Sequence, residues 1–227
     1  MSVCCFCAFC IAGKKAMTKD VLARFPVCDK TIIIDAGHGG LDGGAVSKDG
    51  TSEKDINLSI AKYLESYLTQ SGAKVIMTRN TDESLHKNEK ASVNEKKKSD
   101  LSARKEKVNK SGADLFISIH QNYFQEGKYK GAQVFYDGKS HLSKTCALII
   151  QNSIKDNADN ENLRLPMEID KSKMLFSDLK VPAVLVECGF LSNPEEATKL
   201  KTKEYQQKLA FSIYLGTIQY FDKAERQ

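Results

Sequence analysis

The sequence has little proline and glycine, with 4 Pro and 14 Gly among 227 residues. Together with 28% charged residues, this composition excludes a collagen-like or disordered chain and fits one globular domain. A chain of this length buries enough surface on folding to be stable without disulfide bonds. A small disulfide-stapled scaffold is therefore excluded as well.

The chain also lacks a strong excess of positive or negative charge. The chain has 34 basic and 29 acidic residues, a net charge of +5, and residues 87–110, with 9 basic and 4 acidic residues, supply the whole excess. A nucleic-acid-binding domain would have a higher pI and basic residues spread over one face, so we expect no nucleic-acid partner. The basic stretch fits either a solvated charged loop or a surface that faces an anionic cell wall.

The cysteines form no disulfide framework, because four of the seven lie in the first ten positions. Cys7-Ala-Phe-Cys10 has the spacing of a redox or zinc element, but no second pair follows it. Residues 3–12 form an uncharged apolar run of signal-peptide length that is too short to span a bilayer. We expect residues 1–28 to be an export or anchor remnant or a disordered tail, residues 29–222 the folded domain, and residues 223–227 a tail. Any membrane contact would be made through the N-terminal segment.

From residue 31 onward, short apolar runs alternate with longer segments of helical periodicity. Strands are predicted at residues 32–34, 74–78, 115–120, 132–136, 173–176 and 183–187. Helices are predicted from residue 56 to the glycine at 72, at 101–110, at 142–155, after Pro194 and at 205–221, and residues 79–100 are expected to form a surface loop. This alternation predicts a single α/β domain, a mostly parallel twisted sheet of about six strands with helices on both faces.

Polar residues follow three of the predicted strands. His38 comes shortly after the first strand, His120 ends the third, and Glu187 ends the strand at 183–187. Sites in open α/β sheets form at the carboxyl ends of the strands, so these side chains are expected to share one rim. An ionised carboxylate at a buried strand end is costly unless it is paired or faces a cavity. Glu187 therefore marks a site.

Glu53 is expected at the same rim, because it lies in the connection between the first strand and its helix. Ser52-x-x-Asp55 resembles a capping box, which would place Glu53 in the first helical turn. Two histidines and a carboxylate are the protein ligands of many catalytic zinc ions, and His38, Glu53 and His120 fit that set. Taken singly, each has an ordinary interpretation, as a hydrogen-bonded loop histidine or as a glutamate favoured by the helix dipole.

The third predicted strand has a polar face. Side chains alternate along a strand, so those of Ser118, His120 and Asn122 are expected to project together, opposite the apolar side chains between them. By the same alternation Cys188 is expected to point away from Glu187 and to be a small buried residue. Two other histidines, His86 and His141, are expected to be surface groups.

The segment Gly37-His-Gly-Gly-Leu-Asp-Gly-Gly44 is dense in glycine. It fails the G-x-G-x-x-G pattern of a dinucleotide site, and the following helix begins too late for a nucleotide-binding turn. A Rossmann-like nucleotide binder is therefore a weak alternative. Glycines here would let the backbone turn sharply and let a bulky substrate approach a metal closely.

Five ordered motifs carry a family resemblance over residues 30–221. They are Asp35-x-Gly-His38-Gly-Gly, Glu53-Lys-Asp-x-Asn57-Leu, Leu101-Ser-x-Arg104, Ser118-Ile-His120-x-Asn122 and Val186-Glu187-Cys-Gly-Phe190-Leu-Ser-Asn193. The chain resembles the zinc-dependent N-acetylmuramoyl-L-alanine amidases of the Amidase_3 type. Residues 181–196 are similar to the spore-cortex subgroup, which prepares muramic lactam in endospore peptidoglycan.

The resemblance implies one catalytic Zn²⁺ held by His38, Glu53 and His120, with Glu187 as the catalytic carboxylate. It implies hydrolysis of the amide between the lactyl group of N-acetylmuramic acid and the L-alanine of the stem peptide. Asn122 would position the substrate or a ligand. Arg104 would be either a substrate-side cation or a structural ion-pair partner.

The resemblance also bears on partners and location. The substrate would be peptidoglycan glycan strands with stem peptides, in spore cortex maturation relevant to germination. The protein would be exported, to the cell wall or to the intermembrane space of the developing spore, and an accessory lipoprotein is a possible partner. An alternative from another class is a catalytically silent peptidoglycan-binding module of the same fold.

Overall fold

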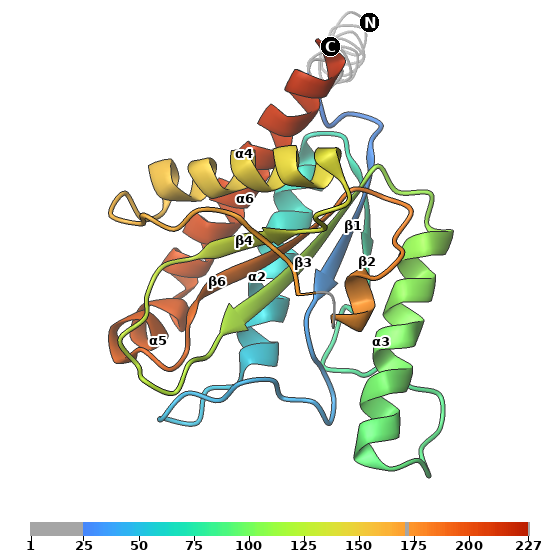
Figure 1. Cartoon of the computed structure of the whole chain (residues 1–227), viewed down its shortest axis with the longest axis vertical. Helices are drawn as coiled ribbons and strands as arrows, with labels where there is room; N and C mark the ends of the chain where they lie inside the picture. The colour runs from blue at the N-terminus through green and yellow to red at the C-terminus, as the bar shows by residue number, and fades with distance from the viewer. Residues whose placement is uncertain (1–24, 171–172, 227) are drawn as a thin grey trace, which may run out of the picture.

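Six strands form one mostly parallel sheet in this computed structural model, which describes residues 25–170 and 173–226 (Figure 1). The strands are β1 (Thr31–Ala36), β2 (Lys74–Met77), β3 (Leu115–Asn122), β4 (Gln133–Tyr136), β5 (Met167–Glu168) and β6 (Ala183–Phe190). Their order is β2-β1-β3-β6-β4-β5, and β4 runs antiparallel to β6 while the other neighbours are parallel. The predicted α/β fold is confirmed. Most of the predicted export or anchor segment, residues 1–24, lies outside the described residues.

Helices cover both faces of the sheet. They are α2 (Glu53–Gln70), α3 (Val93–Lys110), α4 (His141–Asn157), the 3-10 helix η1 (Met174–Phe176), α5 (Pro194–Leu200) and α6 (Lys203–Glu225). Apolar residues of α2, α4 and α6 pack in one large cluster with one face of β1, β3 and β6. A smaller cluster joins the opposite face to α3 and η1. Figure 1 shows α3 standing apart from α2 and α6, with the sheet between them.

The run of three isoleucines in β1 explains why helices must cover both faces of the sheet. Ile32 and Ile34 belong to the large cluster and Ile33 to the smaller one, and all three are fully buried. Strands of a parallel sheet that are covered on both faces have such continuous apolar runs. Val27 is fully buried in the large cluster too, so the packing of the domain begins before residue 29.

Helix α3 is longer than predicted. It begins at Val93 instead of Leu101, and Ser92 forms a capping box with Glu95 at its start. The two apolar side chains of its first half, Val93 and Leu101, are exposed, so these turns show no apolar stripe. Propensity and the cap define this part of the helix, and a search for apolar periodicity does not detect it.

The strand predicted at residues 173–176 is wrong. Met174–Phe176 forms the 3-10 helix η1, and the fifth strand of the chain is instead β5 (Met167–Glu168), which pairs in parallel with β4. Leu175 and Phe176 are buried in the smaller cluster, and a short apolar run fits a buried helical turn as well as a strand.

In the described part of the chain, no helix is long and apolar enough to cross a bilayer.

Candidate active site

The carboxyl ends of β1, β3 and β6 open into a cavity of about 410 Å³. His38, Glu53, His120 and Glu187 all line this cavity. His120 and Glu187 are register partners on β3 and β6, while His38 follows β1 and Glu53 begins α2. The side chains that the sequence placed at one rim therefore lie together, from four separate segments.

Three of these side chains converge on one point. Glu53 Oε1 lies 3.2 Å from His38 Nε2 and 3.0 Å from His120 Nδ1. The three candidate ligand atoms all lie within 4.8 Å of one another, and the two imidazole rings meet edge to face with centroids 4.9 Å apart. Two imidazole nitrogens and a carboxylate oxygen so close together could hold a metal ion, and this donor set is one that zinc uses.

Glu53 is fixed by backbone donors. Its side chain is 4% exposed, and its carboxylate accepts hydrogen bonds from the backbone N–H of Ala45 at 2.8 Å and of Gln121 at 3.0 Å. Burial alone would raise the pKa of Glu53, but the hydrogen bonds with His120 and His38 outweigh burial and hold the pKa far below its usual range. The carboxylate is therefore ionised and ready to bind a cation.

The predicted capping box at Ser52 is wrong, although Glu53 does lie in the first turn of α2. The Ser52 hydroxyl makes no cap and donates instead to the carbonyl oxygen of Gly43 at 2.7 Å. This bond ties the glycine-rich loop to the start of the helix. The loop and Glu53 therefore keep a fixed relative position.

His38 has a left-handed backbone, with φ of 63°. Its Nδ1 lies 2.8 Å from Asp42 Oδ2, and two backbone hydrogen bonds between Gly39 and Asp42, at 2.9 and 3.1 Å, close the turn. An Nδ1–H that donates to a carboxylate leaves the Nε2 lone pair free for a metal. Burial lowers the pKa of His38, but the hydrogen bonds with Asp42 and Glu53 raise it, to about 9.

Glu187 has no partner for one of its carboxylate oxygens. Its Oε2 is buried and has no hydrogen-bond partner in the described structure. Burial raises the pKa of Glu187 above its usual range, and neighbouring His120 only partly opposes this shift. A carboxylate that faces a cavity without a partner is available to a substrate or a water molecule.

The polar face of β3 is arranged as the alternation predicts. Ser118 donates a hydrogen bond of 2.6 Å to Asp35, while Ile117 and Ile119 on the other face pack in the large cluster. Asn122 lines the cavity at the end of the strand. The register shifts between His120 and Asn122, and Gln121, which lies in this irregularity, donates its backbone N–H to Glu53.

Arg104, on α3, contacts the backbone of the loop that contains His38. It donates to Asp35 Oδ1 at 2.6 Å, to Asp100 Oδ2 at 2.6 Å and to the carbonyl oxygen of His38 at 2.7 Å. Its side chain is 2% exposed, and every guanidinium nitrogen has a protein partner. Burial alone would raise the pKa of Asp35, but Arg104, His120 and Ser118 together outweigh burial and lower the pKa to about 2. Of the two roles that the sequence left open for Arg104, these contacts favour the structural one.

Comparison with known proteins decides the family. The Amidase_3 family, N-acetylmuramoyl-L-alanine amidase, matches residues 32–219. This chain belongs to that family. It is 41% identical over 196 residues to the germination-specific N-acetylmuramoyl-L-alanine amidase of Bacillus subtilis (strain 168), covering 86% of this chain and 81% of that one.

Solved structures of similar proteins support the same family assignment. The CwlD amidase from Clostridioides difficile, determined in complex with the GerS lipoprotein, superposes with a TM-score of 0.83 at 44% identity, covering 86% of this chain and all of that one. An N-acetylmuramoyl-L-alanine amidase from Clostridium difficile 630 gives a TM-score of 0.73 at 32% identity, covering 86% and 97%. Membership of the amidase family excludes the Rossmann-like alternative, and the glycine-rich loop presents a histidine instead of a phosphate cradle.

Arg79 also supports the amidase site, and it was not predicted from the sequence. Arg79 is 1% exposed and donates to the carbonyl oxygens of Ala36, Gly37 and Lys54, at 2.8, 3.1 and 2.8 Å. It joins the end of β1 to the start of α2. Arg79 directly follows the predicted strand at 74–78, so its place at the carboxyl edge of the sheet could have indicated a role at the site.

The other histidines differ from each other. The interpretation of His86 as a surface group is wrong, because its side chain is 8% exposed, lines the amidase cavity and lies 2.7 Å from the Ser84 hydroxyl. His141 is exposed at the start of α4, as expected. Cys188 is fully buried in the large cluster, which confirms its interpretation as a small core residue.

Proposed function

We propose that this amidase holds one Zn²⁺ with His38 Nε2, Glu53 and His120 Nδ1, and that Glu187 is its catalytic carboxylate. The observation that carries this proposal is the convergence of the three donor atoms, all within 4.8 Å of one another, in the cavity that Glu187 also lines. The two histidines and one glutamate match the donor set of many zinc hydrolases, which leave a coordination position open.

The bond that is cleaved joins the lactyl group of N-acetylmuramic acid to the L-alanine of the stem peptide. A bound zinc ion would polarise the scissile carbonyl and make a water molecule more acidic. Glu187 accepts the proton of the attacking water and returns it to the departing alanine nitrogen. The raised pKa of Glu187, caused mainly by burial, suits a group that must both take and release a proton near neutral pH.

Asn122 is proposed to hold the substrate beside this carboxylate. Its Oδ1 accepts a hydrogen bond of 2.8 Å from the backbone N–H of Tyr123, so the side-chain NH₂ group can donate to a substrate carbonyl. Arg104 acts indirectly in this account, because its contacts hold the backbone of the His38 loop.

The biological role is proposed from the relatives. Similarity to a germination-specific amidase supports a role in spore cortex maturation, where removal of the stem peptide precedes muramic lactam formation. Such a substrate implies export, to the cell wall or to the intermembrane space of the developing spore. The complex of the similar CwlD amidase with a lipoprotein supports an accessory lipoprotein partner for this chain. Recovery of no lipoprotein with a tagged chain from sporulating cells would argue against that partner.

One experiment separates the proposed roles. The purified chain is loaded with zinc, its metal content is measured, and a peptidoglycan digest is assayed for new alanine amino termini. We expect about one zinc ion per chain, loss of both metal and activity in His120→Ala, and retained metal in Glu187→Gln with activity reduced at least about 100-fold. Glu195→Gln, an exposed residue of α5, is the matched control and should resemble the wild type.

Two results would contradict the proposal. An active Glu187→Gln enzyme would remove the carboxylate from the mechanism. A zinc-loaded wild-type protein that binds peptidoglycan but releases no alanine amino termini would support the catalytically silent binding module instead.

A further inference from the structure

Two exposed aromatic residues directly follow β3, whose last residue, Asn122, lines the cavity. Tyr123 is 52% exposed and Phe124 is 48% exposed, and Tyr123 also lines the cavity. They follow Asn122, so they continue the surface of the site outward. Adjacent exposed aromatics at the mouth of a site are a typical feature of a ligand-binding surface.

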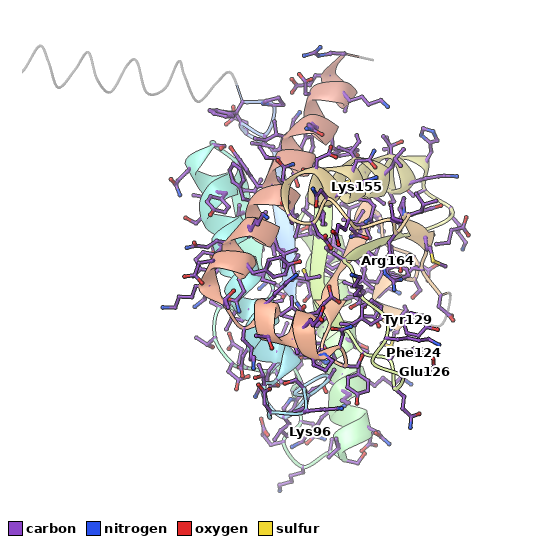
Figure 2. All side chains as sticks on the ribbon, turned by 90° about the vertical axis from the view of Figure 1, so that its left-hand side faces the viewer. Lys96, Phe124, Glu126, Tyr129, Lys155 and Arg164 are labelled. Atoms are coloured by element: carbon purple, nitrogen blue, oxygen red, sulfur yellow. The ribbon has the colours of Figure 1, made fainter. Side chains whose placement is uncertain are left out.

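Phe124 is fixed in place. Its backbone N–H donates to the Ser192 hydroxyl at 3.0 Å, and its ring meets that of Tyr129 edge to face, with centroids 4.8 Å apart. Tyr129 in turn lies 6.2 Å from Phe190, and the Arg164 guanidinium covers Phe190 at 4.6 Å. Figure 2 shows Arg164, Tyr129 and Phe124 following one another along this side of the molecule. A ring held in this way loses little conformational freedom when a ligand packs on it.

Three lysines also line the cavity. Lys96 and Lys97 come from α3, where they pair with Glu89 and Asp42, and Lys173 precedes η1. The scissile amide joins a sugar to a peptide, so the two parts of the substrate leave the site in different directions. The stem peptide has free carboxylates, which suit the lysines. The glycan strand is built of pyranose rings with apolar C–H faces, which suit aromatic rings.

We propose that Tyr123 and Phe124 form a platform that binds the glycan strand of peptidoglycan, next to the muramic acid whose amide is cleaved. This inference rests on the proposed function, since it assigns the sugar side of the same substrate. The platform makes the enzyme prefer strands of several sugars over a single muramoyl peptide. A stacking contact worth roughly 1 kcal/mol changes affinity about three- to tenfold.

The test compares two substrates in the zinc-loaded enzyme. One is N-acetylmuramoyl peptide with a single sugar, and the other is a glycan oligomer of several disaccharides with the same stem peptide. In Phe124→Ala, the ratio of kcat/KM for the oligomer to that for the single-sugar substrate should fall about three- to tenfold, through KM for the oligomer. Phe124→Tyr, which keeps the ring, should restore the ratio.

The matched control is Phe211→Ala on α6. Phe211 is 43% exposed, and its ring meets that of Tyr67 edge to face at 5.5 Å, but α6 packs on the face of the sheet opposite the one that α3 covers. In Phe211→Ala, the ratio of kcat/KM for the oligomer to that for the single-sugar substrate should equal the wild-type ratio. A second measurement uses the Glu187→Gln background, in which binding to insoluble peptidoglycan should weaken on adding Phe124→Ala and stay constant on adding Phe211→Ala.

The outcomes distinguish this inference from the proposed function. A wild-type ratio and undiminished peptidoglycan binding in Phe124→Ala would overturn the platform. An equal loss on both substrates would also overturn it, because the side chain would then serve the peptide or the fold. A zinc-loaded wild type without hydrolysis would refute the proposed function, and the binding measurement would still decide on the platform.

Discussion

The imidazole ring of His120 lies directly against Gly37. A methyl group added to Gly37 would come within 2.2 Å of Nε2 and 2.3 Å of Cε1 of that ring. The backbone cannot easily move away, because the Gly37 N–H donates to the carbonyl oxygen of Ile119 at 3.0 Å. The absence of a side chain at Gly37 therefore sets the position of one of the three proposed ligands.

Gly37→Ala should displace the His120 ring and weaken zinc binding at least about tenfold, with the fold retained. The measurement is a zinc titration against a competing chelator, with circular dichroism to follow the fold. Gly43→Ala is the control, since its methyl group would meet only the Ser52 hydroxyl, at 3.2 Å, and neither imidazole ring. Equal zinc affinity in Gly37→Ala and wild type would show that the ring is not held as described.

Asp42→Asn tests how His38 is oriented. Asp42 lies 2.8 Å from Nδ1 of His38 and is itself paired with Lys97 at 2.8 Å. Loss of such an outer carboxylate typically weakens metal binding about 10- to 100-fold, and we expect a loss in this range. Asp156→Asn, on the exposed face of α4, should bind zinc like the wild type. A wild-type affinity in Asp42→Asn would exclude this orienting role.

Zinc affinity should depend on pH. The pKa of His38 is raised to about 9 in the metal-free site, because its hydrogen bonds with Asp42 and Glu53 outweigh the opposing effect of burial. Below that pH a proton competes with the metal for His38, so apparent affinity should rise with pH, by up to about tenfold per unit between pH 6 and 8. Isothermal titration in buffers of different ionisation enthalpy would also count the released protons. An affinity independent of pH would contradict proton competition at His38.

Arg104→Met tests the buried ion pair that supports the His38 loop. It would leave Asp35, which is fully buried, without its cation, and such a loss lowers the free energy of unfolding by about 3–5 kcal/mol. Urea unfolding at neutral pH measures the change. Lys110→Met removes a cation from the same helix whose partner Glu106 is on the surface, and stability should hardly change. Equal stability of the two variants would show that the buried pair is not needed.

The sequence predicts best those elements in which the burial pattern and the chemistry coincide. The apolar runs of β1, β3 and β6 lead to His38, which follows β1, and to His120 and Glu187 near the carboxyl ends of β3 and β6, and parallel strands bring such ends to one edge. Glu53 could be placed at the same edge because its helix must begin there. The convergence of all three donor atoms required the family resemblance and then the coordinates, because residue spacing sets no distances.

What could not be predicted depends on long side chains that reach across the fold. Arg79 and Arg104 are both fully buried, yet each lies in a segment whose composition is that of a solvated surface. Most of their carbonyl and carboxylate partners come from β1 and the loop after it, far away in the sequence. The first half of α3 was missed for a related reason, because its lysine-rich turns bury no apolar stripe.

The proposed mechanism requires that His38, Glu53 and His120 share one ion. Anomalous diffraction at the zinc absorption edge, from crystals of the zinc-loaded protein, tests it directly. We expect a single strong peak about 2.0–2.2 Å from His38 Nε2, His120 Nδ1 and a Glu53 oxygen. A peak elsewhere in the molecule, with these three side chains still hydrogen-bonded to one another, would contradict it.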